Sequence, residues 1–419
     1  MFNNFFRIAI RNLLRQKGYT LINIIGLSVG IASAMLIFMF VTNEENYDTF
    51  HEKGKNIYRV YQKARFNGEP TQSAWTPAPM AATLKADYPE IENVVRLDEN
   101  TDKLVTLGDK YYILSHAVYA DSGFFSIFSF RLLQGNPHTA LAEPYCVVLT
   151  ESTAKKIFGS EPAMDRLIRV ENDSAAYRIT GIVQDPPRNS HFSFDILISF
   201  SSRNDSKSDF WLNNFLSTYV LLRKGTSAEN LEKKLPDLIV KYIGPQIQKV
   251  VGLSLEEFAK KGMEIGYKLQ PLTDIHLNTD IKHGMKPSSN RKYLYIFSII
   301  GFFIILIASI NFMNLSTARS YKRAREVGMR KVLGSDRSRL IIQFLSESIL
   351  ISIISLILAF GLLELLLPLI NRHRAGAWAG YFQGLATCTD MGFVCCGCRG
   401  SCGFLPGVHA LILSSHGNL

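Results

Sequence analysis

The residues with the greatest capacity for chemistry lie near the carboxyl end, where five of the six cysteines fall within residues 388–402. Cysteine thiolates bind zinc or iron–sulfur clusters when they converge in pairs, commonly as two C-x-x-C motifs. Here Cys395, Cys396 and Cys398 are crowded into the run CCGC, without paired C-x-x-C motifs. We therefore predict no metal site. The sixth cysteine, Cys146, stands alone, and no disulfide is predicted.

Histidines in the middle of the chain raise the question of catalysis. His191, Ser193 and Asp195 are close in sequence, but geometry defines a catalytic triad and adjacency does not. His276 and His283 have no cysteine or acidic residue at a metal-ligand spacing, so we interpret all three histidines as structural or surface residues. The phosphate-binding loop, H-E-x-x-H, G-x-S-x-G and Rossmann glycine patterns are all missing. We predict no enzyme activity and no cofactor held by this chain.

Positive charge is the next chemical signal, because the formal net charge is +10. Residues 1–20 carry four basic residues and no acidic one, and residues 316–340 carry eight basic residues against Glu326 and Asp336. These two segments account for the whole net charge. Nucleic-acid binding would need aromatic residues for base stacking, and Tyr321 is the only one in the second segment. We predict no nucleic-acid partner.

Three apolar blocks explain where this charge lies. We predict transmembrane spans at residues 21–42, 293–315 and 340–370, each long enough for the roughly 20 residues that cross a bilayer. Buried helices of soluble proteins rarely run so long without charge, and the first block exceeds the roughly 7 to 15 apolar residues of a signal peptide. Basic residues mark cytoplasmic flanks. The amino terminus and residues 316–340 are therefore predicted to be cytoplasmic, and residues 43–290 to lie outside.

Residues 43–290 are predicted to form one mixed α/β domain. β-Branched and aromatic residues indicate strands at residues 58–66, 145–150 and 177–185, and helical stretches such as ESTAKKIFG intervene. Pro236 interrupts the helical stretch SAENLEKKLPDLIVKYI, which we expect to be kinked or divided. The predicted fold class is an α-helical transmembrane protein with three spans and a large extracytoplasmic mixed α/β domain.

The segment before the first span has the pattern of a membrane-surface helix. Within residues 1–20, Arg7, Arg11 and Arg15 recur at every fourth position, away from an apolar face. This pattern predicts an amphipathic helix in the cytoplasmic headgroup layer, with its arginines toward anionic lipid. The alternative is an ordinary solvated helix.

The first span carries small residues at one spacing. Gly26, Gly30 and Ala34 recur every four residues, and small residues placed in this way let a second helix approach closely. We predict that this face packs against another helix, whose identity the pattern does not indicate.

Several long stretches, in the same order, resemble the MacB-like, FtsX-type permeases of ABC transporters, particularly those of Bacteroidetes-like bacteria. The opening of that family is matched by RNLLRQKGYTLINIIGLSVGIA and YDTFHEKGKNIYRVYQ. Its periplasmic core domain is matched by VVLTESTAKKIFG, YRITGIVQDPPRNSHFSFDILISF and LQPLTDIHLNTDI, and its permease domain by INFMNLSTARSYKRAREVGMRKVLGSDRSRLIIQFLSESILIS. The resemblance covers about residues 1–371, and residues 291–371 would form the FtsX-like permease domain.

The resemblance implies a mechanotransmission permease in the bacterial inner membrane. In this family a partner ABC ATPase uses the ATP, and its movements pass through the permease helices to the outer domain for efflux or extraction of a substrate. The implied partners are that ATPase, a second permease unit (a homodimer or a tandem half), a membrane-fusion protein in some members, and the lipid bilayer. An alternative is a regulatory or signalling module that controls a periplasmic protein.

The basic segment at residues 316–339 would be the coupling lever between the second and third spans. The resemblance implies that Arg325, Glu326, Arg330 and Lys331 make charged contacts to the ATPase. Gly328 would belong to a small docking face among them. The alternative is a solvated segment that only sets topology.

The chain departs from the family after residue 371. Residues 372–419 become rich in Cys, Gly and His, where the family has a fourth span, and the stretch FLPGVHALIL is too short to be one. We hypothesise that a frameshift near residues 371–374 produced this tail. The chain would then be a partial or non-functional permease.

Overall fold

The computed structural model describes residues 11, 13–15, 17–66, 68–99, 102–171, 175–284, 286, 289–332 and 337–373. The chain divides into two compact units. We call Asn43–Arg291 the sheet domain, and Met1–Thr42 with Lys292–Leu419 the helical unit.

The sheet domain alternates short helices with strands, as the sequence predicts. Its strands are β1 (Ile57–Phe66), β2 (Glu69–Ser73), β3 (Trp75–Pro77), β4 (Ile91–Asp98), β5 (Lys103–Leu107), β6 (Lys110–Leu114), β7 (Ala117–Ala120), β8 (Leu132–Gly135), β9 (Cys146–Thr150), β10 (Leu167–Val170), β11 (Ala176–Val183), β12 (Ile196–Ser199), β13 (Asn214–Leu222) and β14 (Glu264–Pro271). Its α-helices are α3 (Met80–Asp87), α4 (Phe124–Ile127), α5 (Glu151–Phe158), α6 (Ala228–Glu232), α7 (Leu235–Leu238), α8 (Gly244–Val251) and α9 (Leu255–Lys260).

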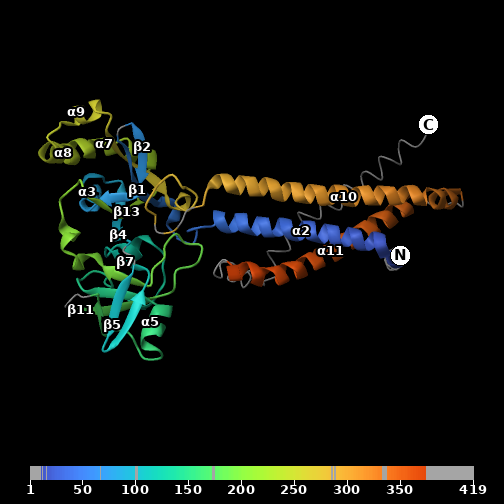
Figure 1. The fold of residues 1–419 in the computed structure, drawn as a ribbon, viewed down its shortest axis with the longest axis horizontal. Coiled ribbons are helices and arrows are strands. Elements are labelled where there is room, and N and C mark those ends of the chain that lie inside the picture. Colours follow the sequence, from blue (N-terminus) through green and yellow to red (C-terminus); the bar gives the residue numbers. More distant parts are fainter. Residues whose placement is uncertain are drawn as a thin grey trace. The chain divides into compact units, whose positions relative to one another are not determined.

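All these strands join one mixed sheet, in the order β14-β1-β13-β4-β7-β12-β9-β11-β10-β5-β6, with β2 beside β1, β3 beside β13 and β8 beside β11. Two pairs are parallel, β9 with β11 and β7 with β12. Helices α7, α8 and α9 lie near β1 and β2, at the opposite end of the sheet domain from α5 and β5 (Figure 1). β14 pairs only with β1, so it forms an edge of the sheet.

The central strands are buried on both faces. Every residue of β9 and β12 is buried, which suits their continuous apolar composition. Because successive side chains point to opposite faces, Val148 and Leu197 join one core, whereas Val147 and Ile196 join another. A third core packs the helices near β14 onto β1, β4 and β13.

Local signals set several helix ends in this domain. The Thr150 side chain accepts a hydrogen bond from the Thr153 backbone and caps α5, as the Ser/Thr preference predicts. Pro236 lies in the first turn of α7, and the stretch around it is divided into α6, α7, η4 (Ile239–Ile243) and α8. The predicted division at Pro236 is confirmed.

The helical unit contains α2 (Lys17–Glu45), α10 (Arg291–Val332) and α11 (Arg337–His373). Within the described residues, three helical stretches are long and apolar enough to cross a membrane: Lys17–Glu45, Arg291–Ala318 and Leu345–Leu367. The predicted combination of three spans with a mixed α/β domain is confirmed. The predicted second span and the basic segment after it belong to one helix, because α10 continues through both without interruption (Figure 1).

Candidate functional site

The predicted coupling residues all lie on α10. Arg325, Glu326, Gly328, Arg330 and Lys331 fall in the last third of this 42-residue helix. Most residues around them favour helix and no proline interrupts them, so the helix runs on through the charged segment. The side chains of these five residues lie outside the part of the chain that the structure describes.

The small residues of the first span lie against α10. A Cβ added to Gly30 would be 2.6 Å from the Ala308 Cβ, and one added to Gly26 would be 3.4 Å from the Asn311 Nδ2. From the opposite helix, a Cβ on Gly301 would be 3.2 Å from the Ile37 Cγ2. Ala34 is buried. These glycines allow α2 and α10 to approach to a distance that side chains would prevent.

The predicted membrane-surface arginines are only partly described. Arg11 and Arg15 are exposed, whereas Arg7 lies outside the described residues. On the apolar side, Leu13 is buried against Phe312 and Ile351 of the other two long helices. The apolar face of this segment therefore contacts protein at Leu13, and Arg11 and Arg15 remain accessible.

A buried polar network lies in the sheet domain just after the end of α2. Its centre is Asp48, which is 0% exposed and adopts a left-handed backbone with φ of 57°. The Asp48 carboxylate accepts hydrogen bonds from the Ser190 Oγ at 2.8 Å, the His191 backbone N–H at 3.1 Å and the His191 Nδ1 at 2.8 Å. The Asp48 backbone N–H donates to the Asn189 carbonyl. Four bonds thus tie one residue to the loop at 189–191.

The network continues from His191 into the sheet. The His191 Nε2 lies 2.9 Å from the Tyr219 hydroxyl on β13, and both side chains are buried. Burial lowers the pKa of His191 even though Asp48 opposes that shift. A neutral His191 therefore donates from Nδ1 to Asp48 and accepts from Tyr219. The hydrogen bonds from His191 and Ser190 hold the pKa of Asp48 below its usual value, despite burial.

A buried arginine lies beside this chain of hydrogen bonds. Arg59 on β1 is 1% exposed and donates from Nη2 to the Gln270 Oε1 at 2.7 Å. Its Nε and Nη1 have no hydrogen-bond partner within the described residues. The nearby carboxyl of Glu99 accepts from the Ser217 Oγ at 2.8 Å. Loss of hydration raises the pKa of Glu99 to about 7, although Ser217 and Arg59 oppose the shift.

Two further contacts fix the chain where it enters and leaves the sheet domain. At the end of α2, the Glu44 Oε2 lies 2.8 Å from the His276 Nε2, and the Tyr47 ring stacks on the His276 ring at 3.4 Å. At the start of α10, the Arg291 Nη2 lies 2.7 Å from the Asp274 Oδ1. Both contacts converge on residues 274–276, which begin at the last residue of η5 (Leu272–Asp274), the short helix that directly follows β14.

This arrangement is a structural network and lacks the geometry of a catalytic site. His191 meets Asp48, whereas Asp195 faces His116 with 3.7 Å between the Oδ2 and Nδ1 atoms, so His191, Ser193 and Asp195 do not form a triad. No group of three or more His, Cys, Asp or Glu residues suited to a metal occurs in the described part. The cysteine cluster lies outside it, and Cys146 is a buried free thiol.

Sequence reasoning missed the polar network, although its residues lie within motifs that carried the family resemblance. Asp48 and Arg59 belong to YDTFHEKGKNIYRVYQ, and His191 belongs to YRITGIVQDPPRNSHFSFDILISF. Gln270 and His276 belong to LQPLTDIHLNTDI. Polar residues within otherwise apolar motifs were the available signal. The sequence gives no indication of which of them pair, because the partners are separated by as many as 211 residues.

Comparison with known proteins identifies the family. The family model of the MacB-like periplasmic core domain matches residues 20–238, which is more than half of the chain, and the FtsX-like permease C-terminal model matches residues 298–391. The chain belongs to the MacB-like, FtsX-type ABC transporter permeases. The FtsX-like match extends past residue 371, where the resemblance was expected to end.

The relatives of this MacB-like permease are distant. The macrolide export ATP-binding/permease protein MacB of Mannheimia succiniciproducens is 21% identical over 83% of the chain and 50% of that protein. The uncharacterized ABC transporter permease YknZ of Bacillus subtilis is 20% identical over 85% of the chain and 84% of YknZ. The chain thus spans about half the length of the MacB relatives that it matches.

Solved structures resemble the sheet domain. A domain of a permease protein from Porphyromonas gingivalis is 23% identical, with 53% of the chain and 91% of that domain covered and a TM-score of 0.46. The periplasmic region of MacB from Actinobacillus actinomycetemcomitans is 15% identical, with 53% and 90% covered and a TM-score of 0.36.

Proposed function

We propose that this chain is a permease subunit that transmits the movements of an ABC ATPase to its sheet domain, for efflux or extraction of a substrate. In this proposal the chain lies in the bacterial inner membrane, with its amino terminus and the basic segment 316–340 in the cytoplasm and the sheet domain outside. ATP is used by the partner ATPase, and a second permease unit completes the transporter.

The observation that carries the proposal is the continuity of α10. At about 1.5 Å per residue, its 42 residues extend about 63 Å, roughly twice the 30 Å core of a bilayer. The apolar stretch ends at Ala318, so 14 further residues carry the helix about 21 Å beyond it. A continuous hydrogen-bonded helix moves as a unit. A displacement of the basic end of α10 would therefore also displace its first residue, Arg291.

At that other end, residues 274–276 of the sheet domain hold both the start of α10 and the end of α2. We call these residues the receiver, because they would take up a movement of either helix. The first residue of α10, Arg291, is paired with Asp274, and two residues later His276 is paired with Glu44 at the end of α2. A change in the separation of Arg291 and Glu44 would therefore strain residues 274–276. The neighbouring Gln270, which holds Arg59, would be displaced with them.

The coupling residues are tested by charge reversal. Glu326→Arg would be purified in lipid nanodiscs with the ABC ATPase that co-purifies with the unmodified chain, and stimulated ATP hydrolysis would be measured. We expect loss of most of the stimulation. The matched control is Glu143→Arg, because Glu143 is exposed in a loop of the sheet domain and makes the same change in net charge. Stimulation that is unchanged in Glu326→Arg would contradict the proposed lever.

The receiver is tested separately. Asp274→Ala should leave ATPase binding and stimulated hydrolysis intact, because the change lies far along the chain from the basic segment. It should weaken the response of the sheet domain to ATP, measured by fluorescence quenching between dyes on two nanodisc-embedded permease copies. A response to ATP that is equal in Asp274→Ala and in the unmodified chain would show that the Arg291 pair is not part of the path.

A further inference from the structure

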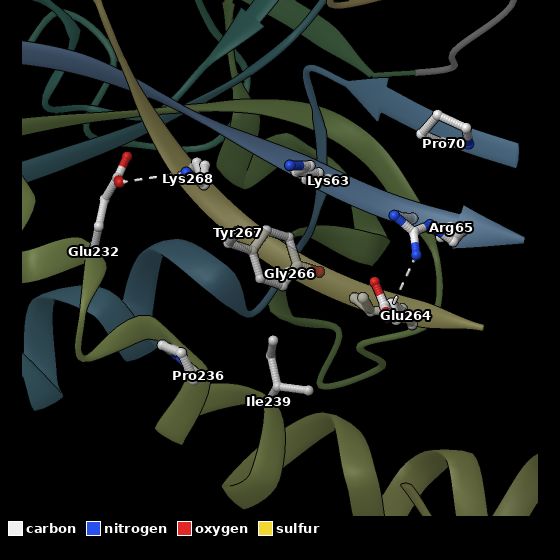
Figure 2. A pocket seen from close by; sticks show the side chains of 12 residues that line it. Lys63, Arg65, Pro70, Glu232, Pro236, Ile239, Glu264, Gly266, Tyr267 and Lys268 are labelled. Atoms are coloured by element: carbon white, nitrogen blue, oxygen red, sulfur yellow. Dashed lines mark ion pairs between the residues drawn. The ribbon is translucent and has the colours of Figure 1, made fainter. Parts of the chain in front are cut away.

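The outer edge of β14 borders a groove. Its volume is about 350 Å³, and it lies between β1 and β14 on one side and α6, α7 and η4 on the other (Figure 2). Figure 2 shows the Tyr267 ring in the wall of the groove, with Pro236 and Ile239 across from it. The groove runs beside residues 264–268, a length of about 17 Å for an extended chain.

Backbone groups of β14 remain free along this groove. The Leu269 backbone N–H donates to the Glu232 Oε1 at 2.8 Å, so it points away from β1. Because backbone groups alternate in direction along an antiparallel strand, the N–H and C=O groups of Ile265 and Tyr267 point the same way. Neither N–H meets an acceptor within the described residues. Unpaired groups in a row are a template for one more strand.

The two faces that an added strand would meet differ in chemistry. On one face, Ile265 and Tyr267 lie with Ile239 in the third core, and Pro236 also lines the groove. This face is apolar, apart from the Tyr267 hydroxyl, which is buried without a hydrogen-bond partner among the described residues.

The other face is charged and has an excess of cations. Arg65 pairs with Glu264 at 3.8 Å, and Lys268 pairs with Glu232 at 4.0 Å. The Arg65–Glu264 pair is solvent-exposed and the Lys268–Glu232 pair is partly exposed. Both are long, so each contributes little. Lys63 lies on β1, opposite Gly266 of β14. It has no acidic partner within the described residues.

We propose that this groove binds an extended segment of a partner protein, which adds a strand to β14 with alternating apolar and acidic residues. Its backbone pairs with Ile265 and Tyr267, its apolar side chains face Pro236 and Ile239, and its carboxylates face Lys63. Main-chain pairing provides affinity in this mode of recognition, and the alternate side chains provide specificity. The inference does not rest on coupling to an ATPase.

The test uses the full chain in nanodiscs and fluorescent heptapeptides of alternating sequence. The acidic probe alternates aspartate with valine, and the control probe alternates lysine with valine. We expect the acidic probe to bind and the basic probe to bind at least about tenfold more weakly. Lys63→Gln should reduce this discrimination. Equal binding of the two probes, or binding of neither, would overturn the proposal.

The backbone contribution is tested at Ile265. Ile265→Pro removes an N–H that points away from β1, which edge strands tolerate, and it should weaken the acidic probe about tenfold, the effect of roughly 1.4 kcal/mol. Ile265→Ala retains the N–H and should weaken binding by a smaller factor. Unchanged protection of the buried Cys146 thiol against alkylation establishes that both variants are folded. Equal affinity of Ile265→Pro and Ile265→Ala would exclude strand addition.

Discussion

Replacing Asp48 by alanine isolates the contribution of the buried network to the stability of the sheet domain. Asp48→Ala removes the acceptor of the Ser190 hydroxyl, the His191 backbone N–H and the His191 Nδ1. The Ser190 hydroxyl can turn to another acceptor, and the proton of His191 can move to its other ring nitrogen. The His191 backbone N–H has no such freedom, so the substitution leaves at least this donor buried and unsatisfied.

The magnitude follows from two costs. An unsatisfied buried donor costs about 1 to 3 kcal/mol, and alanine in the left-handed backbone that Asp48 adopts, with φ of 57°, costs about 1 to 2 kcal/mol. We therefore expect the free energy of unfolding to fall by about 2 to 5 kcal/mol. Asp48→Asn retains a residue type that tolerates this backbone and one carbonyl acceptor. Its loss should be about half as large.

Asp165 offers a matched control. It has φ of 62°, but it is exposed, and its side chain makes no hydrogen bond within the described residues. Asp165→Ala therefore carries the backbone cost alone, about 1 kcal/mol. The difference between the two alanine variants measures the network without the backbone contribution.

The assay is alkylation of Cys146, which is 2% exposed on β9. The five cysteines within residues 388–402 are first replaced by serine, so that Cys146 is the only thiol. When alkylation is slower than refolding, its rate follows the population of open molecules. The unsatisfied donor alone costs about 1 to 3 kcal/mol, so the rates of Asp48→Ala and Asp165→Ala should differ by a factor between about five and about one hundred and fifty. Rates within about threefold of each other would refute the structural role of the network.

Three further predictions concern pH and helix packing. Burial lowers the pKa of His51 from its usual 6.5 to about 4. Between these pH values the unfolded chain binds a proton at this position and the folded chain does not, so about 3 kcal/mol of stability should be lost as pH falls from about 6.5 to about 4. His51→Gln should reduce this loss in the Cys146 assay. Glu99 acts in the opposite sense, because its pKa is raised from 4.5 to about 7: its contribution is present below about pH 4.5 and is lost as pH rises to about 7, so Glu99→Gln should flatten that part of the profile. In the helical unit, Gly30→Ala would place its Cβ 2.6 Å from the Ala308 Cβ. It should destabilise the α2–α10 packing by about 1 to 3 kcal/mol, measured by thermal unfolding in detergent. The control Gly361→Ala has nothing within 4 Å of its Cβ and should be neutral or slightly stabilising.

Hydropathy and charge were sufficient to predict the three spans, because a bilayer imposes a length and a composition on each segment independently of the others. Local β-branched content likewise predicted β1, β9 and β11. The order of strands was not predictable in this way. Tyr58 of β1 pairs with Pro271 of β14, and this neighbour relation depends on packing of the whole domain.

The polar network was hidden for the same reason. His191 was predicted to be a structural histidine, but its acidic partner lies 143 residues earlier, at Asp48. No spacing rule joins them, because the contact forms between a loop after α2 and a loop before β12. The length of α10 was also missed, since the change from apolar to basic residues marks a change of environment and not the end of a helix.

The positions of these residues favour a mechanical interpretation of the family motifs in this chain. Three separate motifs contribute Asp48, His191 and Gln270 to the interior of the sheet domain, although none of these residues has a ligand-facing position among the described residues. The chain enters this domain near Glu44 and leaves it at Arg291, and both are held by residues 274–276. In the proposed mechanism, a rigid interior at that junction would let a displacement of α2 or α10 move the domain as a whole. A soft interior would absorb the displacement locally, so loss of the Asp48 network should weaken transmission even where folding survives.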